Sequence, residues 1–152
     1  MSIIILLSQN YEKSARMTYE NDVQDAQRFL QVGNYKRSLK AALSAVKKSP
    51  RSAMAPNIAG IATSASGHPS DAIKYFQKAI ALNPDFADAQ KNLAQTLIVI
   101  GRADTALAGL VRLSKNTPDD WKVWYLKAQA ELALGKEKDG LGSVQSALAI
   151  QP

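Results

Sequence analysis

The recurrence of prolines and glycines every 34 residues limits the fold of this chain more than any other feature of its sequence. Pro84 lies 34 residues after Pro50 and 34 before Pro118, and Pro152 follows at the same step. The same step joins four glycines, namely Gly33, Gly67, Gly101 and Gly135. Because the chain has only six prolines and eight glycines, eight matches to one period are hard to obtain by chance. A fixed period of this size indicates an array of stacked structural repeats.

The register divides the chain into four windows, each with the pattern of two helices joined by a turn. The windows are residues 19–52, 53–86, 87–120 and 121–152, after a segment of residues 1–18. Glycine suits the turn because the residue after a helix often adopts a left-handed conformation that is costly for residues with a Cβ. Each proline disfavours helix in the residue before it, so we expect the second helices to end at Ser49, Asn83, Thr117 and Gln151. No alternating strand pattern is present, and the chain is predicted to be all-α.

Columns of small residues follow the same register and predict where paired helices approach closely. Eleven of the twelve residues in three columns are small: Ala26, Gly60, Ala94 and Ala128; Ser38, Ala72, Ala106 and Gly140; Ala45, Ala79, Leu113 and Ala147. A fourth column holds Ala42, Phe76, Leu110 and Val144, which would fill the space between neighbouring repeats.

Residues 1–18 form a separate case. Ile3, Ile4, Leu7 and Tyr11 fall on one face of a helix, which predicts a short amphipathic helix. Such a helix can cover the first repeat, join a partner or be partly disordered, and the first of these is our expectation. The apolar run Ile3 to Leu7 is too short for a signal peptide or a membrane span, so we expect a cytoplasmic protein.

The residues that usually carry chemistry are scarce. There is no cysteine, and His68, the single histidine, lies in a turn where capping the next helix is its expected role. Asp119 and Asp120 precede Trp121, where they suit a helix N-terminus better than an acid–base pair. No phosphate loop, dinucleotide fingerprint or zinc spacing is present. We therefore expect no enzyme activity, no cofactor and no metal site.

Positive charge is concentrated in the first third of the chain. Residues 1–52 carry nine Lys or Arg against four Asp or Glu, a local charge of +5, while the two middle windows are neutral. The basic outer face is Lys36, Arg37, Lys40, Lys47, Lys48 and Arg51. Such a face can attract nucleic acid, acidic protein or anionic lipid. Without an aromatic or glycine pattern for base stacking, a solvated helix face is the favoured interpretation and nucleic acid is disfavoured.

The spacing and residue types together resemble the tetratricopeptide repeat family. The matching residues are Gly60, Gly67, Ala72, Phe76, Ala79 and Pro84, and then Trp124, Ala128, Gly135, Ala147 and Pro152. The column of Trp124 departs from the family pattern in the other repeats, where it holds Asp22, Pro56 and Gln90, and Leu113 replaces a small residue. The resemblance covers residues 19–152 and implies an α-solenoid, a right-handed superhelix of four helix-turn-helix repeats.

The resemblance also implies that the first helix of each repeat lines a concave groove, which serves as a protein-interaction scaffold for a peptide or a helix. The predicted groove residues are Asn57, Lys91, Asn92, Gln95, Lys122, Tyr125 and Gln129. The family's carboxylate clamp is matched at only two of five positions, by Asn92 and Lys122, so a groove without a clamp is favoured.

An alternative is that the array is a regulatory or structural arm of a larger enzyme, such as a bacterial sulfotransferase or glycosyltransferase. The chain lacks the polar capping helix that solenoids usually need. Leu141, Val144 and Leu148 are therefore expected to be uncovered and to favour self-association.

Overall fold

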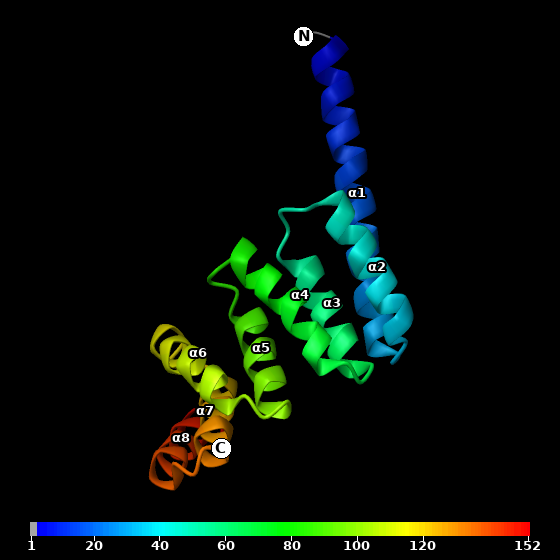
Figure 1. Cartoon of the computed structure of the whole chain (residues 1–152). Helices are drawn as coiled ribbons and strands as arrows, with labels where there is room; N and C mark the ends of the chain where they lie inside the picture. Colours follow the sequence, from blue (N-terminus) through cyan, green and yellow to red (C-terminus); the bar gives the residue numbers. More distant parts are fainter. Residues whose placement is uncertain (1–2) are drawn as a thin grey trace.

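The computed structural model describes residues 3–152, and this part of the chain contains eight α-helices and no strand (Figure 1). Their bounds are α1 Ile3–Gln31, α2 Tyr35–Lys48, α3 Met54–Ala65, α4 Pro69–Leu82, α5 Ala87–Val99, α6 Ala103–Asn116, α7 Trp121–Ala133 and α8 Glu137–Ile150. The helices form four consecutive pairs, and the prediction of an all-α solenoid is confirmed.

The turns and stops lie where the 34-residue register places them. The four turn glycines have positive φ angles between 73° and 90°, the left-handed region that glycine adopts without strain. The second helix of each pair ends at a C-cap residue directly before a proline, and these caps are Ser49, Asn83, Thr117 and Gln151.

Close packing explains the columns of small residues. All twelve residues of the three columns are buried. The tightest case is Gly60 on α3, where an added Cβ would lie 2.5 Å from the ring of Phe76 on α4. Phe76 and Leu110, one period apart, are among the largest fully buried side chains of residues 3–152.

Helix α1 is longer than predicted. The N-terminal segment and the first helix of the first repeat form one helix of 29 residues rather than two. No glycine or proline occurs between Ile3 and Gln31 to interrupt it. The N-terminal part of α1 projects beyond the array (Figure 1), and its residues Ile3, Ile4, Leu7 and Tyr11 are exposed. The expectation that this segment covers the first repeat is therefore wrong.

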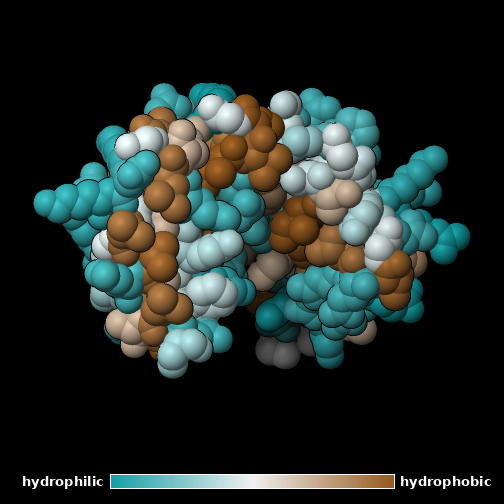
Figure 2. Space-filling model, turned by 90° about the horizontal axis from the view of Figure 1, so that it is seen from below, coloured by the Kyte–Doolittle hydropathy of each residue, from teal (hydrophilic) through white to brown (hydrophobic). Residues whose placement is uncertain are grey.

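The helices form an inner and an outer layer. Contacts join α1 to α3, α3 to α5 and α5 to α7, so the first helices of the repeats line one side of the array. Between repeats, the second helices α2, α4 and α6 contact α3, α5 and α7 respectively. Seen from below, the surface is hollowed between two masses of the molecule (Figure 2). This arrangement places side chains of α3, α5 and α7 around a common space.

Candidate functional site

The largest concentration of predicted groove residues surrounds a hollow of about 440 Å³ on the inner layer. It is lined from α3, α5 and α7 by Asn57, Ile61, Asp88, Lys91, Asn92, Gln95, Trp121, Lys122, Tyr125 and Leu126. Six of the seven predicted groove residues are in this set. The seventh, Gln129, lies next to the hollow and donates a hydrogen bond from its amide nitrogen to the Tyr125 hydroxyl at 3.1 Å.

Lys91 is held between two carboxylates at one wall of the hollow. Its ammonium nitrogen lies 2.6 Å from Asp120 and 3.0 Å from Asp88, and its side chain is 16% exposed. Asp120 is also the N-cap of α7, where it accepts a hydrogen bond from the backbone N–H of Lys122 at 3.0 Å. The capping role predicted for Asp120 is confirmed, and the ion pair ties α5 to the start of α7.

The pKa shifts of this pair follow from its partners. Burial alone would raise the pKa of Asp120, but the hydrogen bond and charge of Lys91 and two backbone N–H groups hold it below its ordinary value. Burial would likewise lower the pKa of Lys91, and the hydrogen bonds and charges of Asp120 and Asp88 raise it instead. Both groups are therefore charged at neutral pH, and Lys91 has little positive charge to offer to a ligand.

Asn57 and Asn92 form an amide pair across two repeats. The Asn92 amide nitrogen donates to the Asn57 side-chain oxygen at 3.0 Å, and Asn57 is buried. Part of the hydrogen-bonding capacity of Asn92 is thus used within the protein. Of the two residues that match a carboxylate clamp, only Lys122 makes neither an ion pair nor a side-chain hydrogen bond within residues 3–152.

An aromatic pair forms the accessible part of the hollow. The rings of Trp121 and Tyr125 are tilted by 56° with centroids 6.3 Å apart, and Tyr125 is 48% exposed. The Lys122 ammonium lies 5.7 Å from the centroid of the Trp121 ring. Four lining residues, Trp121, Leu126, Ile61 and Asp88, are not among the seven predicted groove residues. The spacing of four residues between Trp121 and Tyr125 could have revealed the first of these, since such residues share a helix face.

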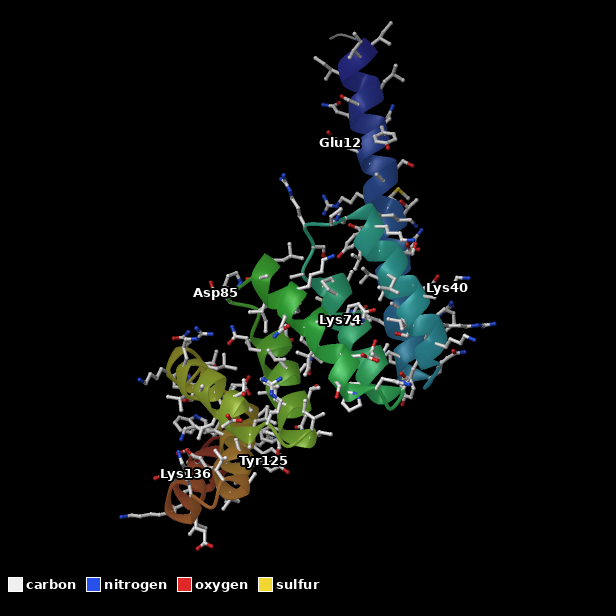
Figure 3. The ribbon with its side chains drawn as sticks, in the orientation of Figure 1. Glu12, Lys40, Lys74, Asp85, Tyr125 and Lys136 are labelled. Carbon is white, nitrogen blue, oxygen red and sulfur yellow. The ribbon has the colours of Figure 1, made fainter. Side chains whose placement is uncertain are left out.

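The basic outer face lies away from the hollow. All six of its residues are exposed and belong to α2 or to the segment that follows it. Lys40 is on the outer side of α2, whereas Tyr125 lies on α7 near α5 (Figure 3). Lys48 differs from the others because its ammonium pairs with Asp22 of α1 at 2.7 Å. Burial would raise the pKa of Asp22, but hydrogen bonds from Lys48 and Ser44 lower it.

The turn residues were predicted with mixed success. His68 is the N-cap of α4, but its side chain makes no capping hydrogen bond, so the predicted capping role of its imidazole is wrong. Its Nδ1 is instead 3.4 Å from the Ser66 hydroxyl. Asp119 is exposed beside Asp120.

A model of the tetratricopeptide repeat family matches residues 64–130. These residues belong to the tetratricopeptide repeat family. The fold agrees with this family over a longer span: MamA 41-end from Desulfovibrio magneticus RS-1 has a TM-score of 0.81 and 21% identity, with 89% of this chain and 76% of that chain covered. The TPR2B domain of yeast Sti1, solved as a complex with pHsp70, has a TM-score of 0.72 and 20% identity, with 76% and 98% covered.

A curated relative is much longer than this tetratricopeptide array. Superkiller protein 3 of Schizosaccharomyces pombe is 31% identical over 80 residues, which are 53% of this chain and 6% of that protein. What the comparisons detect is a tetratricopeptide domain, a type that usually mediates contacts between proteins and is usually non-catalytic. None of the helices in residues 3–152 is both long and apolar enough to cross a membrane.

Proposed function

We propose that this tetratricopeptide array is a non-catalytic scaffold that binds a peptide or a helix of a partner protein in its concave groove. The observation that carries the proposal is the composition of the hollow. Exposed Tyr125 and Gln95, the ammonium of Lys122 and the apolar side chains of Ile61 and Leu126 surround one space. Aromatic anchors beside amides and apolar side chains are typical of protein interfaces.

The charges of the groove favour a ligand that is not strongly acidic. Asp88, Lys91 and Lys122 line the hollow, and Asp120, which pairs with Lys91, brings the sum of these four charges to zero. Lys91 is already paired with two carboxylates, and recognition of a terminal carboxylate needs several donors at once. We therefore infer that ring contacts and amide hydrogen bonds dominate over charge in binding.

The experiment that tests this function begins with capture of partners and ends with a titration. Peptides of a captured partner are titrated against the unmutated chain and against Tyr125→Ala. Tyr11→Ala is the matched control, because Tyr11 is an exposed tyrosine on the projecting part of α1. Weakening by Tyr125→Ala alone supports the groove, whereas equal affinity in all three proteins contradicts it.

A second candidate function is that of an arm of a larger enzyme, and a specific observation favours it. Leu107 and Leu110 of α6 are buried, whereas Leu141 on α8, one period after Leu107, is 61% exposed. A further repeat or another domain packed on α8 would bury this surface, as α7 buries that of α6. The coding sequence that follows Pro152 tests this candidate, because it either continues into a further domain or does not.

A further inference from the structure

The projecting part of α1 has an apolar face that nothing in residues 3–152 covers. Leu7 is 63% exposed and Tyr11 77%, and Ile3 and Ile4 are exposed to a similar degree. These four residues share one side of the helix, because residues three or four apart lie on the same face. Large apolar side chains gathered on an exposed face mark an interaction surface.

The apolar face of α1 and the end of α2 are on the same side of α1. Thr18 and Asp22 follow Tyr11 by seven and eleven residues, about two and three helical turns, so they lie on the same face as Tyr11. Both contact Lys48: its ammonium is 3.4 Å from the Thr18 carbonyl oxygen and 2.7 Å from Asp22. The apolar face therefore points to the side of α1 on which the C-terminal end of α2 lies, and Lys47 and Arg51 are exposed at that end.

Ion pairs leave most of the cations of residues 1–52 without a matching acid, and of these Lys47 and Arg51 lie at the C-terminal end of α2. Three of the four acids in residues 1–52 are paired, Glu20 with Arg16, Asp25 with Arg28 and Asp22 with Lys48. Within the described residues 3–52, only Glu12 is left against six cations, and this difference of six minus one equals the local charge of +5. The six cations are Lys13, Lys36, Arg37, Lys40, Lys47 and Arg51.

We propose that this end of the molecule binds the surface of an anionic lipid bilayer without crossing it. The projecting part of α1 enters the headgroup boundary at an angle with Ile3, Ile4, Leu7 and Tyr11, because α2 packs further along on the same side of α1 and stays outside the bilayer. Lys47 and Arg51 face the lipid phosphates. Stable surface binding needs two contributions, apolar insertion and attraction of basic residues to anionic lipid, and this surface provides both.

Charge favours a lipid surface over a second copy of the chain. Residues 53–86 and 87–120 are each neutral, and residues 121–152 carry four lysines against three acids. No repeat therefore offers the net negative charge that would attract the basic end of another copy. An anionic bilayer offers phosphates and an apolar layer on one flat surface.

The test is co-sedimentation of the full chain with vesicles made of equal parts phosphatidylglycerol and phosphatidylcholine. We expect the unmutated chain to bind these vesicles, and to bind phosphatidylcholine vesicles or any vesicles in high salt much less. Leu7→Glu should weaken binding about tenfold or more. Neutralising Lys47 and Arg51 with glutamine should weaken it by about fivefold for each charge. Both sites are exposed, so circular dichroism should be unchanged in every variant.

Val99→Glu is the matched control, since Val99 on α5 is 65% exposed, close to the 63% of Leu7, and lies outside the apolar face of α1. Its binding to vesicles should equal that of the unmutated chain. The proposal is overturned if the unmutated chain does not sediment with phosphatidylglycerol vesicles, or if Leu7→Glu binds as tightly as Val99→Glu. A third outcome also overturns it: the unmutated chain forms a dimer in sedimentation velocity, Leu7→Glu abolishes that dimer, and neither protein binds the vesicles. The apolar face of α1 would then bind a second copy of the chain.

Discussion

Lys91 and Asp120 form a 2.6 Å ion pair that connects α5 to the N-terminus of α7. These two helices carry most of the side chains around the hollow, so the pair helps to set the spacing of the groove walls. Its partners lie 29 residues apart in sequence, and Asp120 contributes twice, as the partner of Lys91 and as the cap of α7.

Replacing Asp120 by Asn separates these two contributions, because Asn is also a good N-cap. We expect Asp120→Asn to lower the free energy of unfolding by about 1 kcal/mol at neutral pH, through loss of the ion pair. Urea denaturation measures the change. Asp119→Asn is the control, since Asp119 is exposed and makes no ion pair in residues 3–152, and its stability should equal that of the unmutated chain.

The pH dependence of this stabilisation follows from the pKa directions. The pKa of Asp120 is lowered from 3.8 in the folded protein, so the stabilisation is complete above 3.8 and is lost as pH falls through the folded-state pKa. The pKa of Lys91 is raised from 10.5, so its contribution is complete below 10.5 and is lost as pH rises through the folded-state pKa. The difference between the unmutated chain and Asp120→Asn should thus be constant near neutral pH and disappear in strong acid. A difference that persists in strong acid would mean that the ion pair is not its cause.

Two glycine substitutions should change stability in opposite directions. Gly60→Ala places a Cβ 2.5 Å from the buried Phe76 ring, and we expect it to destabilise the protein by about 1–3 kcal/mol. Gly109→Ala adds the same atom to a site on α6 with no neighbour within 4 Å, where it should stabilise by up to about 1 kcal/mol. Thermal unfolding of the two variants compares them directly. Equal melting temperatures would show that the contact with Phe76 does not limit the size of residue 60.

Tyr125→Ala should weaken groove binding by about 1–3 kcal/mol while helical content stays nearly unchanged. The reason is that Tyr125 is half exposed beside Trp121 and forms an anchor with little conformational entropy to lose. Isothermal titration with a captured partner peptide provides the measurement.

The alternative prediction is that the partner binds the basic outer face and not the groove. If the partner binds there, reversing the charges of Lys40 and Lys47 should weaken binding and make it strongly dependent on salt, while Tyr125→Ala has no effect. Lys48 was predicted as part of the same face, but its pairing with Asp22 makes it a poor probe, since its replacement would also change packing between α1 and α2.

The exposed apolar surface of α8 predicts self-association at high protein concentration. Leu141 and Leu148 are 61% and 56% exposed, whereas Leu107 and Leu110 of α6 are buried. Sedimentation velocity should show a concentration-dependent mass that Leu148→Glu reduces. A strict monomer at all concentrations, with strong amide protection of α8, would contradict this expectation.

The sequence predicted the repeat boundaries well because proline and glycine act on their own backbone. A positive φ at Gly101 or a helix end before Pro118 needs no knowledge of neighbouring repeats. The departures from the family pattern were harder to interpret. Gln90 stands one period before Trp124, and its amide donates to the Pro84 carbonyl as the Trp124 indole N–H donates to that of Pro118 at 2.8 Å. Two dissimilar residues thus make equivalent hydrogen bonds, which a comparison of residue types does not reveal.

The sequence predicted where the groove lies, but it did not predict which of its side chains are already paired within the protein. The family resemblance placed Lys91 and Asn92 on the inner face, and the structure puts both at the hollow. Their partners come from neighbouring repeats, Asp120 for Lys91 and Asn57 for Asn92. Contacts between residues about 30 positions apart depend on how the repeats stack, and residue spacing within one helix does not contain this information.

Because α1 is one uninterrupted helix, the number of residues between its projecting part and the first repeat determines the direction in which the apolar face points. Each residue turns an α-helix by about 100°, so the direction of Leu7 is fixed relative to Asp22. Inserting two residues between Ala15 and Arg16 would rotate the apolar face by about 200° and turn it away from the end of α2, whereas inserting seven would change its direction by only about 20°. Two alanine insertions at one position can therefore separate the effect of direction from that of composition.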